Sequence, residues 1–161
     1  MGNQHFDRSK KNHFSDYNRE EIRGSIIDHM NTIETNLNII ICDFIKPVNK
    51  DGFNKIILNS SIISLGAKLK ILRNIESFDN KIITQIQQLS SIRNAFAHVE
   101  ILERLKLKKN GTKYDFERLP DVMDVMNSSG EIKRKKTREE ASKFFTLSES
   151  TNTYLTEHVN G

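Results

Sequence analysis

The residues best suited to chemistry lie close together in the segment LSSIRNAFAH, which holds Arg93, Asn94 and His98. A histidine that titrates near neutrality can take a proton from a ribose 2′-hydroxyl or deliver one to a leaving oxygen. A guanidinium can stabilise the negative charge that develops on phosphorus, and the asparagine can orient either group or the substrate. We therefore expect these three residues to be catalytic in RNA cleavage, with no metal and no cofactor.

The spacing by itself is weak support, because an arginine is also followed five residues later by a histidine at Arg8 and His13. The plain alternative is an exposed arginine and a histidine that lies at a helix terminus. Arg93 differs from Arg8 because it lies in a strongly periodic helix and is followed directly by Asn94.

A helical projection places these side chains away from the expected core. At 100° per residue, Leu89, Phe96 and Val99 fall within about 60° of Ile92. Arg93 lies about 140° from His98 on the same projection, so the two meet only if a side chain leans across or a second copy takes part. The small residues on this side leave room for a homodimer that brings the groups into one groove. The side opposite the core carries Ser90, Ser91, Arg93, Asn94, Ala97 and His98.

Two helices are expected before this one. Apolar residues recur at steps of three and four over 18–46, which predicts an amphipathic helix, and Pro47 and Gly52 end it. A second apolar stripe predicts a helix from near Phe53 to Leu72.

The helix that carries the candidate site follows a short break at 77–79 and is expected to run to about Leu105. A last helix is expected from near Thr137, with acidic residues in its first turn. Residues 148–153 are poor in helix formers, which leaves the continuity of this last helix open.

Between these two helices, apolar residues alternate with polar residues. Leu105 and Leu107 precede Asn110-Gly111, and Tyr114 and Phe116 follow, which is a hairpin signal. We therefore expect an all-α bundle of four to five helices with a small, basic β-hairpin excursion over 105–136. This forms a single domain over 17–161, preceded by a basic, disordered tail over 1–16.

The excursion is strongly basic. The chain has a net charge of +4, and residues 104–138 carry eleven Lys or Arg against five Asp or Glu. Such a patch can attract RNA, and we assign RNA binding to Lys133, Arg134, Lys135 and Lys136. The alternative is a solvated charged loop. Tyr114 and Phe116 are the aromatic residues of the segment, and two aromatic residues are too few to favour base stacking.

Composition excludes several classes of protein. Apolar residues make up 36% and charged residues 29%, and no apolar run approaches the roughly 20 residues that span a bilayer. The first residues lack an apolar secretory segment. Cys42 is the single cysteine, which excludes an internal disulfide and favours a reducing cytoplasm. No metal-ligand spacing or glycine-rich nucleotide loop is present.

The segment around Arg93, Asn94 and His98 resembles the signature of the HEPN superfamily, in which an Arg and a polar residue precede a His late in the third helix. The upstream SLGAKLKIL resembles the second helix of mannitol-operon repressor-like proteins and of a second group of domains of unknown function. The resemblance covers 18–105 and leaves out the tail and the basic segment.

The resemblance implies a helical bundle, a homodimer and a composite site at the dimer interface. Many members are metal-independent endoribonucleases of toxin or defence systems, with an antitoxin or regulatory partner, and leave a 2′,3′-cyclic phosphate. Others are non-catalytic regulators or protein-interaction modules. Three hypotheses therefore stand: such a ribonuclease, such a regulator, and a nucleic-acid-binding protein that uses only the basic segment.

Overall fold

The computed structural model describes residues 19–111, 113–127 and 129–160, and the side chains of Glu103, Arg118 and Asn160 are not described. The basic tail predicted over 1–16 lies outside the described residues. Among the described residues, none of the helices combines the length and apolar character needed to cross a membrane.

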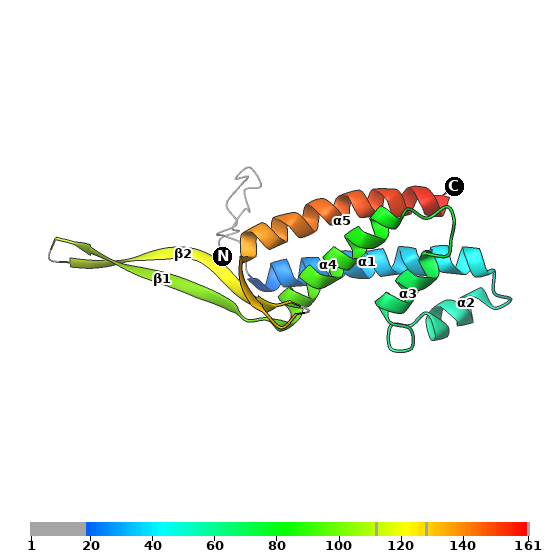
Figure 1. Ribbon diagram of the computed structural model, residues 1–161, viewed down its shortest axis with the longest axis horizontal. Coiled ribbons are helices and arrows are strands. Elements are labelled where there is room, and N and C mark those ends of the chain that lie inside the picture. Colours follow the sequence, from blue (N-terminus) through cyan, green and yellow to red (C-terminus); the bar gives the residue numbers. More distant parts are fainter. Residues whose placement is uncertain (1–18, 112, 128, 161) are drawn as a thin grey trace, which may run out of the picture.

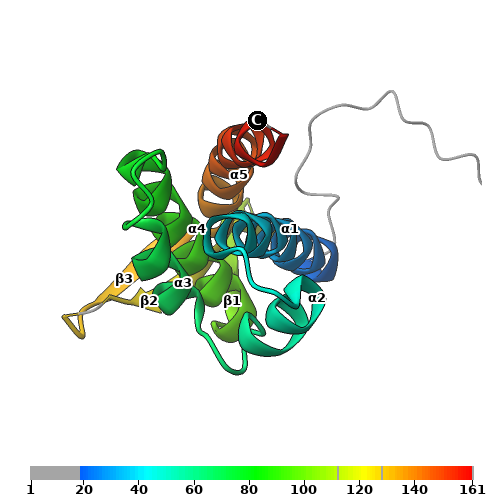
Figure 2. The same ribbon diagram turned by 90° about the vertical axis from the view of Figure 1, so that its right-hand side faces the viewer.

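Three long helices form the body of the molecule. Helices α1 (Arg19–Ile45), α4 (Asn80–His98) and α5 (Thr137–Asn160) run alongside one another, as two views at right angles show (Figures 1 and 2). The observed α1 agrees with the predicted helix over 18–46. Its core face consists of Ile22, Ile26, Met30, Ile33, Leu37, Ile40, Ile41 and Cys42.

Helix α5 is continuous, which answers the question that its sequence leaves open. Ser148 and Thr151 are buried, and their hydroxyls are satisfied. Ser148 donates to the carbonyl of Phe145 at 3.0 Å, and Thr151 donates to Oε1 of Gln85 on α4 at 3.2 Å. Tertiary contact with α4 therefore outweighs the low helix propensity of this stretch.

The second predicted helix is interrupted. It consists of the short α2 (Lys50–Gly52), the π-helical turn η2 (Phe53–Ile57) and α3 (Leu65–Leu72). Between η2 and α3, Oδ1 of Asn59 accepts hydrogen bonds from the backbone and hydroxyl of Ser61. Such side-chain-to-backbone bonds compete with the helix ladder, and they explain the break.

A three-stranded antiparallel sheet follows α4, in the order β1-β2-β3. Strand β1 covers Ile101–Asn110, β2 covers Lys113–Met126 and β3 covers Ile132–Lys136. Gly111, with a φ of 63°, and Gly130, with a φ of 84°, lie in the two turns, where the left-handed conformation suits glycine. The turn predicted at Asn110-Gly111 is therefore confirmed.

The all-α prediction was wrong, because this sheet makes the fold mixed α/β. The helix expected to reach Leu105 ends at His98, and Val99 is already extended, with a φ of −97° and a ψ of 138°. From Arg104 onward the apolar residues alternate with polar ones instead of recurring every three to four positions, which favours a strand. Ile101 and Leu102 are adjacent and fit either structure, and the burial of Ile101 in the core places the start of the strand there.

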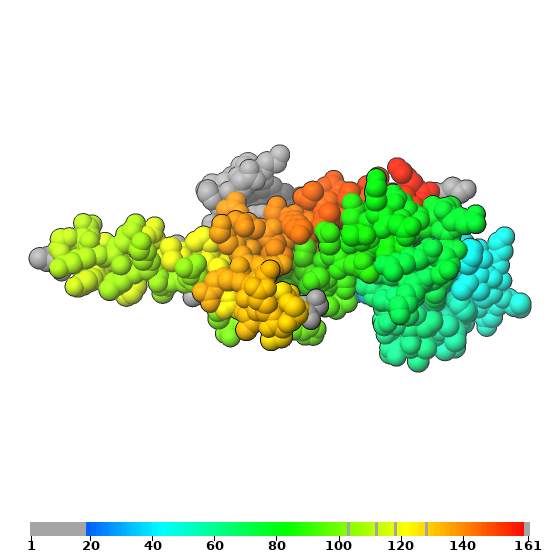
Figure 3. Space-filling view, in the orientation of Figure 1, coloured from blue at the N-terminus to red at the C-terminus, as the bar shows by residue number. Residues whose placement is uncertain are grey.

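The base of the sheet belongs to the core, and its far end does not. Ile101, Val122 and Met123 are buried, and α5 packs against both β2 and β3. Beyond this base the β1–β2 hairpin projects from the body as a narrow arm (Figures 1 and 3). The predicted small excursion is therefore a long hairpin at one end of the bundle, and α2 and α3 lie at the other end.

Candidate functional site

Helix α4 carries the candidate catalytic residues. Asp79 is its N-cap, and the carboxylate accepts from the backbone N–H of Lys81 at 2.8 Å. The core side of the helix is apolar throughout, so the helix can present its other side to solvent. The buried residues are Ile82, Ile83, Ile86, Leu89, Ile92, Ala95 and Phe96.

From Ser90 to His98 the opposite side of α4 carries mostly small side chains, as the helical projection predicts. Ser91, Asn94, Ala97 and His98 are exposed, and the side chain of Arg93 is 29% exposed. Small side chains surround Asn94 and His98, which leaves this face open to a substrate or to another protein.

Arg93 is held by a carboxylate on α1. Its Nη2 atom lies 3.8 Å from Oε1 of Glu34. Oε2 of Glu34 accepts from the hydroxyl of Ser60 at 2.8 Å and from Nζ of Lys68 at 3.4 Å. Glu34 therefore joins α1, α3, α4 and the loop after η2, and it directs the guanidinium toward α1.

Lys68 supplies the buried charge of this cluster. Its side chain is only 1% exposed, and that of Glu34 is 15% exposed. A buried ammonium is costly without a counter-ion, so Glu34 is needed by Lys68 as well as by Arg93. The sequence did not indicate this pair, because the two residues lie far apart in the chain, although Lys68 belongs to the segment SLGAKLKIL.

A polar hollow opens beside this cluster, between α1 and the η2–α3 segment. Its volume is about 440 Å³. Oδ1 of Asn38 is buried there and accepts no hydrogen bond from a described residue. Amide, hydroxyl and charged groups dominate the lining, which consists of Asn31, Glu34, Thr35, Asn38, Asn54, Lys55, Leu58, Asn59, Ser60 and Lys68.

His98 is the last residue of α4. The end of the helix is anchored from α1, because Nη2 of Arg23 donates to the carbonyl of Val99 at 3.0 Å. A cation at a helix C-terminus also interacts favourably with the helix dipole. Arg23 therefore fixes the backbone beside His98, a role that its sequence context did not indicate.

Within the described part of one copy, no hydrogen bond or ion pair joins Arg93 to His98. Among the described residues, the ion pair of Arg93 is with Glu34, and no hydrogen bond or ion pair reaches His98. On a regular helix, residues five apart leave the axis about 140° from each other. This separation favours a site shared between two copies over one within a single copy.

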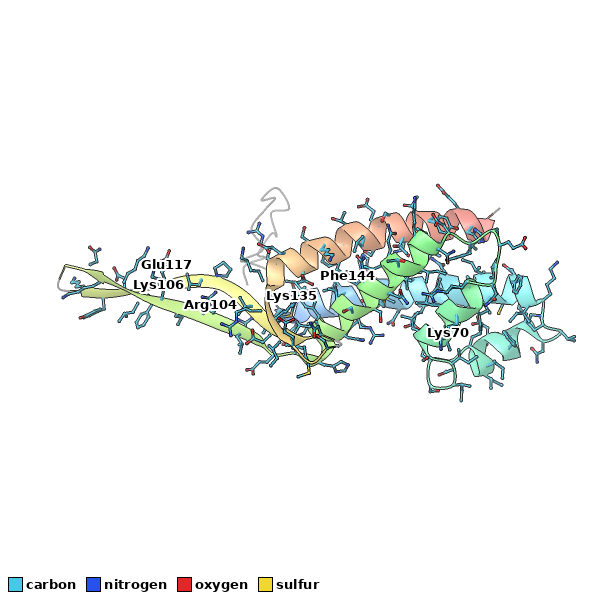
Figure 4. The ribbon with its side chains drawn as sticks, viewed as in Figure 1. Lys70, Arg104, Lys106, Glu117, Lys135 and Phe144 are labelled. Atoms are coloured by element: carbon cyan, nitrogen blue, oxygen red, sulfur yellow. The ribbon has the colours of Figure 1, made fainter. Side chains whose placement is uncertain are left out.

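The basic residues assigned to RNA binding are largely neutralised within the chain. Each residue of 133–136 forms an ion pair, and the Arg134 guanidinium holds the pKa of the Asp124 carboxyl below its ordinary value through two hydrogen bonds of 2.7 Å. The pairs are Lys133–Glu131, Arg134–Asp124, Lys135–Glu140 and Lys136–Glu139. Lys135 lies at the base of the sheet (Figure 4).

Two other histidines, His29 and His158, pack against aromatic side chains of the fold. Nδ1 of His29 is 2.8 Å from the carbonyl of Ser25, and its ring meets Phe145 edge-on. The ring of His158 stacks on Tyr154 with centroids 5.7 Å apart. Among the described residues, no group of three or more His, Cys, Asp or Glu is arranged to hold a metal ion.

Comparisons of this chain with protein-family models, with curated proteins and with solved structures found no match. The resemblance to the HEPN superfamily therefore stays a prediction that depends on residues 89–98 and the helix before them.

Proposed function

We propose that this protein is a metal-independent endoribonuclease of HEPN type, with a composite site at a homodimer interface and a toxin or defence role. The observation that carries the proposal is the open face of α4. There Asn94 and His98 are exposed, and Arg93 is held in place by Glu34.

The proposed reaction is an internal transesterification. The ribose 2′-oxygen attacks phosphorus, the bond to the 5′-oxygen breaks, and the products are a 2′,3′-cyclic phosphate and a 5′-hydroxyl. His98 removes the proton from the 2′-hydroxyl or delivers one to the leaving oxygen. The Arg93 guanidinium stabilises the charge on the phosphorane-like transition state, and Asn94 orients the phosphate.

A second copy supplies the missing partner in this scheme. The small side chains on the exposed side of α4 allow two such helices to approach across a two-fold axis. Arg93 of one copy then faces His98 of the other, which removes the angular separation found within one helix. The cell interior is the proposed compartment, because the Cys42 thiol is buried and unbridged, and an antitoxin or regulatory protein is the proposed partner.

The test is cleavage of a defined RNA in EDTA by the purified protein and by two variants. We expect His98→Ala and Arg93→Ala each to lower cleavage by at least about a hundredfold, the usual effect of losing a general acid–base group or a group that stabilises transition-state charge. Lys81→Ala, an exposed change on the same helix, is the control and should cleave normally.

Mixing the two inactive variants tests the composite site. Random exchange of subunits gives half mixed dimers, each with one intact Arg93–His98 pair, so about a quarter of the activity should return. If both residues act within one copy, mixing restores nothing. Cleavage that survives His98→Ala would remove the proposed role of the imidazole altogether.

The alternative is a non-catalytic regulator or protein-interaction module that resembles the mannitol-operon repressor group. The observation in its favour is the internal pairing of residues 133–136, which leaves little free positive charge where RNA binding was expected. This alternative predicts a stable dimer that does not cut RNA and is harmless when expressed. Growth arrest on induction that Arg93→Ala relieves would argue against it.

A further inference from the structure

The projecting hairpin has two different faces. Leu107 pairs with Phe116 and Lys109 pairs with Tyr114 in the β1–β2 register, and Leu105 lies two residues before Leu107. Partners in an antiparallel ladder and residues two apart in a strand share a face. One face of the arm is therefore apolar and aromatic. The other face carries charged residues, among them Arg104, Lys106 and Glu117 (Figure 4).

The apolar face is uncovered. Leu105 is 62% exposed, Leu107 is 53%, Tyr114 is 59% and Phe116 is 72%. A ribbon of two strands has no second layer to bury such side chains, and the arm projects away from the helices (Figure 3). Exposed apolar surface of this kind indicates a binding partner.

The charge of the arm indicates an anionic partner. Residues 104–118 carry six Lys or Arg against two Asp or Glu. Lys108 pairs with Glu117 at 2.9 Å, while Arg104, Lys109 and Lys113 form no ion pair with a described residue. A second copy docked face to face would bring two such cationic arms together, which like-charge repulsion disfavours.

We propose that this face of the hairpin binds single-stranded RNA by base stacking on Phe116 and Tyr114. The inference rests on the proposed ribonuclease function and assigns it a substrate class. Strand β1 begins three residues after His98, so RNA lying along the arm leads directly to the end of α4.

The two aromatic rings are two residues apart on β2 and share one face, so successive bases can stack on them. Leu105 and Leu107 on β1 extend the apolar surface beside the rings. Lys109 and Lys113 near the turn supply charge to the phosphates. The number of aromatic residues in the sequence argued against base stacking, but the register places both rings on the same face of the arm.

The experiment measures fluorescence anisotropy of a labelled oligouridine of about 12 nucleotides, within the range of single-strand site sizes. All proteins carry His98→Ala, so that the RNA is not cut during the titration. Phe116→Ala and Tyr114→Ala are compared with Ile132→Ala, because Ile132 is 62% exposed on β3 of the same sheet. We expect each aromatic change to weaken binding about tenfold and Ile132→Ala to leave it unchanged.

Salt dependence separates stacking from charge. Lys109→Gln should reduce the slope of log affinity against log salt by about one unit, whereas Phe116→Ala should lower affinity without changing that slope. Phe116→Trp, which keeps a stacking ring, should bind as tightly as the parent. An RNA duplex of the same length should compete poorly, because its bases are not free to stack.

Two results would overturn the proposal. In one, Phe116→Ala binds the oligouridine as tightly as the parent protein. In the other, the aromatic variants sediment as a smaller species while RNA affinity is unchanged, which would make the face a contact between copies. Either result leaves the proposed cleavage intact, since that reaction is measured independently with His98. Conversely, stacking without any cleavage would support the hairpin site and reject the ribonuclease.

Discussion

Lys68 illustrates how one residue connects stability with the candidate site. It lies on α3 with 1% of its side chain exposed, and Glu34 is its counter-ion at 3.4 Å. The same carboxylate holds Arg93. A buried pair of this kind contributes little net stability when intact, but leaving one partner alone is costly.

We therefore expect Lys68→Ala to lower the free energy of unfolding by about 3 kcal/mol, measured by urea denaturation, because it leaves a cavity in place of a buried side chain and removes the nearer of the two cations beside Glu34. Lys70→Ala on the same helix should change it little, because Lys70 is exposed (Figure 4). Glu34→Gln combined with Lys68→Met should recover much of the loss by removing both charges. Equal stability of the Lys68→Ala and Lys70→Ala variants would contradict the buried pair.

At the scale of elements, the start of α4 sets the frame for the candidate site. Asp79 caps the helix through its bond to the N–H of Lys81, and its own N–H donates to the hydroxyl of Tyr154 on α5 at 2.8 Å. The carboxylate also lies at the positive end of the helix dipole. This cap and the Arg23–Val99 bond at the other end fix the helix between α1 and α5.

Replacing Asp79 by alanine should lower the free energy of unfolding by about 1 kcal/mol, the usual effect of losing an N-cap. Asp79→Asn keeps an accepting oxygen and should retain most of the stability. Thermal unfolding followed by circular dichroism compares the two. If asparagine is as damaging as alanine, the cap oxygen does not stabilise the helix.

At the scale of the whole molecule, we expect the stability of the helical bundle to be nearly independent of the arm. The apolar side chains of the sheet that reach the core are Ile101, Val122 and Met123 at its base. Those of the arm beyond it are exposed (Figure 3). Burial of apolar area dominates folding stability, so the outer arm should contribute little to it.

Replacing residues 104–119 with a tight Asn-Gly turn should therefore leave the helical circular dichroism and the unfolding midpoint within a few degrees of the parent. Affinity for single-stranded RNA should fall sharply. Met123→Ala at the base is the contrasting change, with an expected loss of about 2–5 kcal/mol. A shortened protein that fails to fold would show that the arm belongs to the core.

Local patterns in the sequence were sufficient for several elements. The apolar period of α1 predicted its bounds, and Asn110-Gly111 predicted the first hairpin turn. The projection of α4 correctly predicted that Asn94 and His98 would be exposed. Each of these features depends on residues within a few positions of one another, because helical period and turn conformation are local properties.

Tertiary structure alone determined the rest. The end of α4 at His98 was predicted too late, because apolar residues continue on both sides and only the packing of Ile101 into the core selects the strand. The Glu34–Lys68 pair and the shared face of Tyr114 and Phe116 were likewise not predicted. Contacts between distant residues depend on how the elements pack and on the register of the strands, and neither can be predicted from a short segment of sequence.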